Sequence, residues 1–265
     1  TAAEIQPEAA AEEIPAETAQ TVEETVAEET IEETIEETAF SGCTLLASVY
    51  LPKSLTYIGN SAFKNQTKLF KLTFESNINI GKIGVSAFEN VSMLTSLEIP
   101  ASVTEIGSKA FYNCTGLTSI TFNEGSNGSI TFGSSAFAQC SKITSVYLPS
   151  TVETFNGTVF NGCDALTKIE VSPNNPYLES SADGVLYNES YSTLLYYPRG
   201  LNVDKATLDA LPWDKITKIG EAAFSGHTSL TAFEIKKGIT EIGNNANETA
   251  KDYIADLVIG DVDNI

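Results

Sequence analysis

The residues best suited to chemistry in this 265-residue chain are four cysteines and one histidine: Cys43, Cys114, Cys140, Cys163 and His227. Each lies three residues after a phenylalanine, and the cysteines are separated by 71, 26 and 23 residues, unlike the spacing of a zinc site. Equivalent positions elsewhere hold Gln66 and Val91. A position that accepts valine is a packing position, so we expect free cysteines that act as small buried hydrophobes.

The single histidine has a structural explanation as well. Phe40-Ser-Gly-Cys-Thr44 and Phe224-Ser-Gly-His-Thr228 are the same segment with one substitution, which predicts a half-buried His227 in a packing role. The sequence also contains no Gly-x-Ser-x-Gly motif, phosphate-binding loop or pair of metal ligands. We therefore expect no enzyme activity, no catalytic or metal-binding residue and no cofactor.

The segment around these residues is repeated along the chain. An Ala-Phe pair recurs at several places, ending at Phe40, Phe63, Phe88, Phe111, Phe137 and Phe224, and Val159-Phe160 is a variant of it. Successive phenylalanines are 23, 25, 23, 26, 23 and 64 residues apart, so the base period is 23 with short insertions. A fixed period of this length indicates a solenoid of stacked coils.

The clearest coil lies between Phe88 and Phe111. Its apolar residues are spaced by 3, 3, 2, 4 and 3 positions, which fits neither a long helix nor a long strand. We expect a short strand at 97–99, a second extended segment at 103–106 and one helical or 3₁₀ turn at 110–117. Stacking in register would place parallel strands about 4.8 Å apart. Cysteines on successive coils would then be within disulfide range, but their side chains would point the same way.

The pattern Ala-Phe-x-x-Cys-x-x-Leu-x-x-Ile-x-Leu-Pro-x-x-Val-x-x-Ile-Gly resembles the BspA-like group of leucine-rich repeats over about residues 39–265. The resemblance implies a mainly β fold with short 3₁₀ or helical turns, a right-handed, gently curved solenoid of short parallel strands. It also implies a secreted or surface-attached protein, mostly of bacteria and some protists. Several members are described as adhesins for host matrix or plasma proteins, or for other microbes.

Residues 172–200 resemble an element of this family and predict a β-hairpin inserted between coils, with 189–192 between two aromatic runs. Some of its tyrosines should pack on neighbouring coils. An insert that interrupts a solenoid is nevertheless a common place for specific contacts. The candidate binding residues here are Tyr187, Tyr191 and Tyr196.

A second candidate surface is the outward-facing side of the predicted main strands, which lines the concave face in the family's architecture. Serine and threonine dominate it, and they suit exposed strands without any binding role. Aromatic side chains dominate interface hot spots, so the aromatic and charged exceptions are the candidates. They are Tyr50, Phe70, Lys71, Glu98, Tyr147, Lys168 and Glu170.

The negative charge is concentrated at one end of the chain. The formal net charge is -20, and residues 1–38 contain 13 glutamates but no lysine, arginine or aspartate, so the remaining residues carry only -7. We interpret residues 1–38 as a solvated, self-repelling linker, because glutamates recur at i,i+4 and no single apolar stripe is present. The alternative is a helix over the open end of the solenoid, for which Ile31 and Ile35 are available in the last two turns.

These features favour a non-catalytic, adhesin-like binding module, extracellular or at the cell surface, whose partner is a host or microbial surface protein or a glycan. The alternative is a structural or accessory repeat domain of a larger secreted protein whose activity lies elsewhere. The acidity argues against nucleic acid, and no apolar stretch approaches the ~18 residues that would span a bilayer. We expect any secretion signal to have been removed, and the Leu257, Ile259, Val262 and Ile265 pattern to continue into a further coil beyond Ile265.

Overall fold

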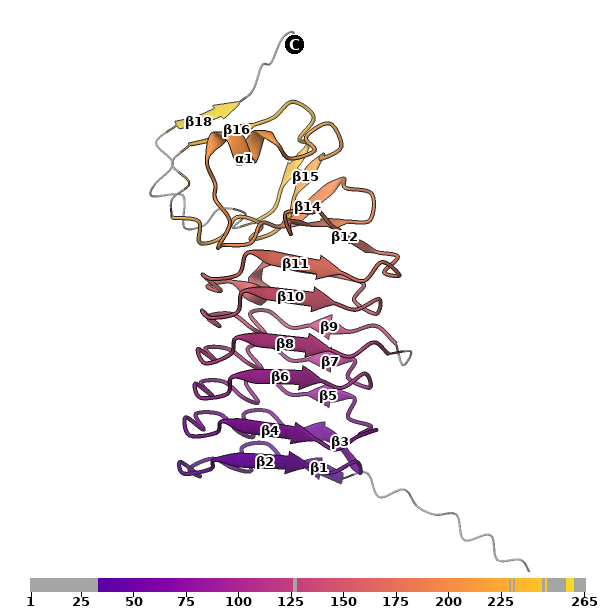
Figure 1. The fold of residues 1–265 in the computed structure, drawn as a ribbon, viewed down its shortest axis with the longest axis vertical. Coiled ribbons are helices and arrows are strands. Elements are labelled where there is room, and N and C mark those ends of the chain that lie inside the picture. The colour runs from indigo at the N-terminus through magenta and orange to yellow at the C-terminus, as the bar shows by residue number, and fades with distance from the viewer. Residues whose placement is uncertain are drawn as a thin grey trace, which may run out of the picture. The chain divides into compact units, whose positions relative to one another are not determined.

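The computed structural model describes residues 33–125, 128–228, 230, 232–244, 246 and 256–259, most of which form stacked coils (Figure 1). The first strand of each coil, here called the main strand, is β2 (Ser48–Leu51), β4 (Lys71–Phe74), β6 (Ser96–Ile99), β8 (Ser119–Phe122), β10 (Ser145–Leu148) or β11 (Lys168–Val171). The second strands are β1 (Glu33–Ile35), β3 (Leu55–Ile58), β5 (Lys82–Ile83), β7 (Glu105–Ile106) and β9 (Thr131–Phe132). The prediction of a mainly β solenoid of short parallel strands with a base period of 23 residues is confirmed.

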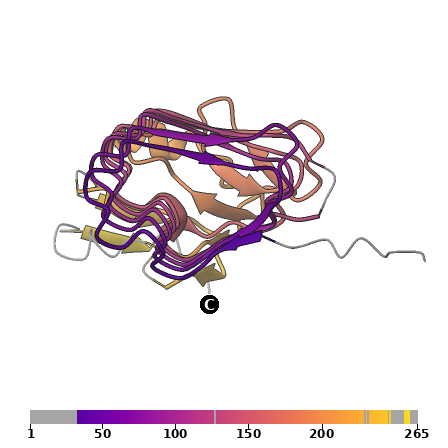
Figure 2. The same ribbon diagram turned by 90° about the horizontal axis from the view of Figure 1, so that it is seen from below.

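A column of stacked phenylalanine rings fills the centre of the coils. Successive ring centroids lie 4.6–5.6 Å apart along this column: Phe40, Phe63, Phe88, Phe111, Phe137 and Phe160. All of these rings except the first are fully buried. Viewed along the stack, successive coils lie over one another (Figure 2). Each Ala-Phe pair therefore occupies the same place in its coil, which is why the distance between successive pairs equals the repeat length.

The Ile-Gly step after the second strand keeps successive coils close together. A Cβ atom added to Gly107 would lie 2.7 Å from the backbone of Gly84 in the preceding coil, and one added to Gly84 would lie 2.8 Å from Gly59. A methyl group has no room at such distances, so the spacing between coils depends on glycine at this step.

The turn after each phenylalanine needs a residue in the left-handed conformation. Asn65, Asn90 and Asn113 fill this position with φ of 63°, 63° and 58°. Asparagine adopts this conformation more readily than most residues. The side chains also form a ladder, because Asn90 Nδ2 donates to Asn65 Oδ1 at 2.7 Å and Asn113 Nδ2 donates to Asn90 Oδ1 at 2.8 Å.

The two rows of strands differ in continuity. The second strands form one parallel sheet in the order β1-β3-β5-β7-β9, whereas the main strands pair only as β2–β4, β6–β8 and β10–β11. Figure 1 shows β6 set farther from β4 than β2 is. The main sheet is therefore interrupted twice, between β4 and β6 and between β8 and β10.

Proline explains where the main strands do not pair. In each pair, the residue after the later strand donates its N–H to a carbonyl of the earlier coil, at 2.9–3.0 Å: Glu75 to Leu51, Asn123 to Ile99 and Ser172 to Leu148. The residues after β6 and β10 are Pro100 and Pro149, which have no N–H to donate. The two missing hydrogen bonds fall at the two interruptions.

The inserted residues of the longer coils lie between the main and second strands, at 75–81 and 123–130. In the first of these segments, Ile78 and Ile80 are both buried, so the extra residues add to the core. Ser102 Oγ lies 2.9 Å from the carbonyl oxygens of both isoleucines. The segment is thus fixed to the next coil.

Beyond the last main strand the pattern changes to an antiparallel unit. Strands β12 (Leu178–Ser180), β13 (Leu186–Asn188) and β14 (Thr193–Tyr196) are antiparallel neighbours, within the 172–200 segment where we expected a hairpin. The same sheet continues in parallel through β15 (Lys218–Ile219) to β17 (Glu241–Ile242). The insert therefore joins the row of second strands rather than lying outside the stack.

Helical structure is sparse in the described ranges, with the 3₁₀ helix η1 (Gly157–Phe160) and the helix α1 (Lys205–Asp209). Neither these nor any other described segment forms a helix long and apolar enough to cross a membrane. Strands β16 (Ala232–Ile235) and β18 (Asp256–Ile259) pair in parallel, which sets Leu257 and Ile259 in the coil register. Val262 and Ile265 lie outside the described residues.

The first described strand precedes Ala39, where we placed the start of the solenoid. Strand β1 pairs in parallel with β3, and Ile35 lies opposite Ile58 and packs against the core. Residues 33–35 are therefore extended and not helical. Residues 1–32 lie outside the described residues, so the interpretation as a linker stays a prediction.

Candidate functional site

Exposed apolar side chains gather on the first three described coils. Tyr50 on β2 is 62% exposed, and Phe70, directly before β4, is 53% exposed. Leu45 and Met93, on the turns that lead into β2 and β6, are 84% and 47% exposed. In the repeat register Leu45 and Met93 share one column, and Phe70 lies two positions further along its own coil. We call these four residues the N-terminal apolar patch.

The other candidates on the main strands are mostly engaged within the chain. Three pairs are formed: Tyr147 with Glu124, Lys168 with Glu170 and Glu98 with Asn123. The Tyr147 hydroxyl donates to Glu124 at 3.0 Å, and Asn123 Nδ2 donates to Glu98 at 2.9 Å. Lys71 is exposed. Among the aromatic candidates, Tyr50 and Phe70 are consequently the ones that present most of their surface to solvent.

Two of the three insert candidates are wrong as surface residues. Tyr187 and Tyr196 are fully buried, and burial raises the pKa of both hydroxyls. The Tyr196 hydroxyl donates to the Phe160 carbonyl at 3.1 Å. Tyr191 is half-buried, with its ring 4.8 Å from that of Tyr187 and the Lys215 ammonium 5.2 Å from its centroid. The insert sheet packs on the coils through the face that carries these tyrosines. The sequence pattern of the strands does not tell which of the two faces of that sheet is buried.

The cysteine column is a packing position with an added hydrogen bond. Cys114, Cys140 and Cys163 are buried free thiols, and each donates to the carbonyl of the column phenylalanine in the preceding coil at 3.2–3.3 Å. Gln66 Nε2 makes the same contact with the Phe40 carbonyl at 2.8 Å. The expectation of buried free thiols is confirmed for these three cysteines. Cys43 is exposed, contrary to that expectation, because no described coil covers it.

His227 fills this same position in its coil. It is buried, deeper than the half-buried position that the sequence predicted, and its Nε2 lies 3.0 Å from the Tyr197 carbonyl oxygen. Burial lowers the pKa of the imidazole. Within the described ranges, no group of three His, Cys, Asp or Glu residues could hold a metal ion.

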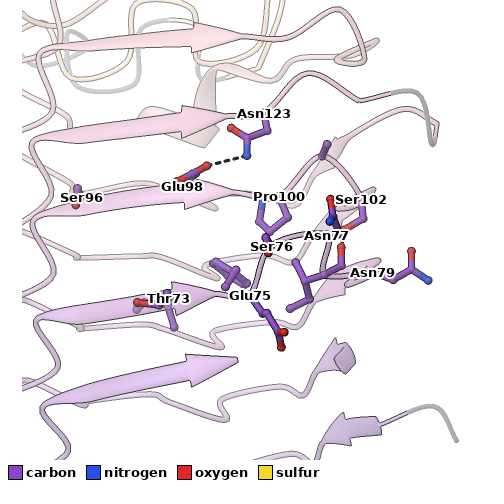
Figure 3. Close-up of a pocket in the computed structure, with 14 residues that line it drawn as sticks. Thr73, Glu75, Ser76, Asn77, Asn79, Ser96, Glu98, Pro100, Ser102 and Asn123 are labelled. Carbon is purple, nitrogen blue, oxygen red and sulfur yellow. Dashed lines mark hydrogen bonds between the residues drawn. The ribbon is translucent and has the colours of Figure 1, made fainter. Parts of the chain in front are cut away.

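A cleft that the sequence did not reveal lies at the first interruption of the main sheet, between β4 and β6 (Figure 3). Its volume is about 600 Å³. Polar residues predominate in its lining: Thr73, Glu75, Ser76, Asn77, Asn79, Ser96, Glu98, Ser102 and Asn123. The apolar part includes Leu72 and Phe74, which are half-buried here, whereas Leu97 and Ile99 at the same positions of β6 are buried. None of the described lining residues is basic.

The carboxylates at the two edges of this cleft are held from outside it. Glu75 Oε2 accepts the Lys53 N–H at 2.9 Å, in the direction of β2. Glu98 Oε1 accepts from Asn123, in the direction of β8 (Figure 3). Neither of these hydrogen bonds spans the interruption, so the space between β4 and β6 stays open.

The second interruption is bridged. Glu124, in the inserted segment after β8, accepts hydrogen bonds from the Tyr147 hydroxyl at 3.0 Å and from the Ser150 hydroxyl at 2.8 Å. Although partial burial alone would raise its pKa, hydrogen bonds from Ser150, Ser172 and Tyr147 hold the pKa of Glu124 below its usual range. In the repeat register, Ser76, Glu98 and Ala101 occupy the places of Glu124, Tyr147 and Ser150. The first interruption therefore lacks the bridge that closes the second.

Comparison with known families agrees with this architecture. The model of the BspA type leucine rich repeat region matches residues 19–126, 81–198 and 202–259, in six copies. The chain belongs to this family. No curated protein sequence matches it significantly.

Solved structures of repeat proteins share the fold. The crystal structure of the pneumococcal vaccine antigen PcpA is 26% identical with a TM-score of 0.68, over 80% of this chain and 50% of that one. A leucine rich cell surface protein from Faecalibacterium prausnitzii is 21% identical with a TM-score of 0.55, over 79% and 60%. The chain thus spans about half the length of PcpA.

Proposed function

We propose that the chain is a non-catalytic binding module of an extracellular or cell-surface protein and that it binds a partner protein through the N-terminal apolar patch. The main observation in support is the exposure of Tyr50 and Phe70 on a face otherwise dominated by serine and threonine. Aromatic side chains provide large, rigid contact areas and are over-represented among interface hot spots. Family membership supports a binding role, because stacked coils present long continuous surfaces.

The patch also has the chemistry of an interface centre. Four exposed apolar side chains lie on neighbouring coils, and the exposed polar residues Ser48 and Lys71 lie on the same strands or directly beside them in the chain. Isolated exposed hydrophobic residues are common, but a group with a polar rim is typical of a protein contact. The extracellular location rests on the family and on PcpA, a vaccine antigen that shares the fold.

A binding screen tests this proposal. The protein would be measured against immobilised extracellular-matrix and plasma proteins by surface plasmon resonance, and any partner would be retested with Tyr50→Ala and Phe70→Ala. Each truncation should weaken binding about tenfold or more, since hot-spot side chains contribute roughly 2 kcal/mol or more. Tyr177→Ala is the matched control, because Tyr177 is an aromatic residue of the insert that is 46% exposed. Equal affinity of all three variants would reject the patch as the binding site.

A further inference from the structure

We propose that the open cleft between β4 and β6 is a saccharide-binding site, separate from the N-terminal apolar patch, that takes a short neutral oligosaccharide. A cleft of about 600 Å³ lies within the range of small-ligand sites, roughly 300–1,000 Å³. The two interruptions of the main sheet have the same origin in Pro100 and Pro149, but only the second is bridged. The first interruption therefore leaves a cavity that the described side chains do not fill.

The lining selects the chemistry of the ligand. Side-chain hydroxyls and amides both donate and accept hydrogen bonds, and carboxylates accept them, so together they match the hydroxyl groups of a sugar. Thr73, Ser96 and Asn77 provide such groups from both sides of the cleft. Leu72 and Phe74 are half-buried, and the exposed part of each side chain offers apolar surface for the C–H faces of a sugar ring. The absence of basic residues among the described lining disfavours sulfated or other anionic saccharides.

An added peptide strand is the main alternative occupant, since β4 and β6 each lack a neighbour on this side. Strand addition depends on a regular row of main-chain donors and acceptors. Pro100 removes one donor from the β6 side of the cleft, directly after the strand. The main-chain edge is thus incomplete, whereas the side-chain groups are numerous, which favours recognition of a ligand by side chains.

The bridge at the second interruption supplies the variant that tests this proposal. Ser76→Glu, Glu98→Tyr and Ala101→Ser together would place the Glu124, Tyr147 and Ser150 arrangement across the first interruption. Glu170→Tyr is the matched control, because Glu170 occupies the position of Glu98 on β11, where the strands are paired. The bridged variant retains Leu45, Tyr50, Phe70 and Met93, so binding through the apolar patch should be unaffected.

The probes are maltotriose, cellotriose and triacetylchitotriose, with a heparin disaccharide and a ten-residue Thr-Val peptide as alternatives, studied by saturation-transfer NMR and calorimetry. We expect at least one neutral trisaccharide to bind, at least tenfold weaker binding by the bridged variant, and unchanged binding by Glu170→Tyr. If the bridged variant does not fold, Glu98→Ala should weaken binding at least threefold with an unchanged circular dichroism spectrum. Binding of only the peptide or the anionic sugar, no binding of any neutral trisaccharide, or equal binding by the bridged variant would overturn the proposal.

Discussion

At the scale of single residues, one position of the repeat accepts chemically different side chains because it is a packing position, held by the apolar Val91 in one coil and by hydrogen-bond donors in others. Cysteine, glutamine and histidine at this position all contact a carbonyl of the coil before them, through Cys114, Gln66 and His227 among others. The single histidine is consequently explained by packing, as its repeat position predicted.

His227 should make the protein less stable in acid. Burial, together with the nearby Arg199 cation, keeps its pKa in the folded state below the usual value near 6.5, against the opposing effect of the Tyr197 carbonyl. The unfolded chain therefore binds a proton at pH values where the folded chain does not, and stability falls as pH drops through this interval. His227→Cys, the residue found at this position in other coils, should reduce the loss of melting temperature between pH 7.5 and 5.0. Identical pH profiles for the two proteins would contradict this explanation.

The asparagine ladder makes a second prediction at this scale. Asn90 has a φ of 63° and hydrogen bonds to Asn65 and Asn113. Asn90→Gly loses the hydrogen bonds but keeps the left-handed conformation at little cost, whereas Asn90→Ala also strains the backbone by about 1–2 kcal/mol. Urea denaturation should therefore show Asn90→Ala to be less stable than Asn90→Gly by about 1 kcal/mol. The reverse order would mean that the turn does not require this conformation.

At the scale of elements, the main strands alternate between those followed by proline and those followed by a residue with an N–H. The repeat thus consists of two coils rather than one, with prolines at 52, 100 and 149 and insertions in the intervening coils. The two interruptions follow from this alternation. The row of second strands stays continuous across the first interruption and ends at β9; beyond it the described coils are joined on this side by the isolated bridge between Ile130 and Val152.

Amide exchange should reveal this alternation directly. The exposed residues Thr118 and Thr167 donate their N–H groups to the same position of the preceding coil at 2.9 Å. Thr95 and Thr144 are equally exposed, but across the described chain their N–H groups make no such bond because they face the interruptions. Hydrogen exchange followed by NMR should be at least tenfold faster at Thr95 and Thr144. Similar protection at all four amides would show that the main sheet is continuous in solution.

Much of the fold was accessible from the sequence because the Phe column and the Ile-Gly step recur in most coils. The strands at 97–99 and near 103–106 were predicted from spacing alone, and the structure has β6 and β7 there. The open cleft was not predicted, although the 25-residue spacing and Pro100 both lie next to it in the sequence. The N–H that proline lacks interrupts the sheet only at the boundary with the coil that would have accepted it, and the sequence alone did not show which boundary that is. The buried Tyr187 and Tyr196 were misplaced because an antiparallel insert can turn either face toward the coils.

At the scale of the whole molecule, the stability of stacked coils is close to a sum of coil and interface contributions. Phe111 is buried with a ring stacked on each side, whereas Phe40 is half-buried at the first described coil and stacks on Phe63. Phe111→Ala should cost about 3–5 kcal/mol, the range for large buried aromatic residues, and Phe40→Ala less than half of that. Calorimetry and urea titration would measure both. Equal losses would show that position in the stack does not determine the contribution of a ring.

The uneven main sheet also determines how the molecule responds to tension. A load applied between the two ends of the stack would pull neighbouring coils apart along the direction of their hydrogen bonds. The boundaries at the two interruptions lack the row of main-strand hydrogen bonds that the other coil boundaries from β2 to β11 have. They are held by the turns after the phenylalanines and, in addition, by the β5–β7 pair at the first interruption and by the Glu124 hydrogen bonds at the second. The stack should therefore yield first at these two boundaries, which divide it into mechanical segments and place the cleft at one of the hinges between them.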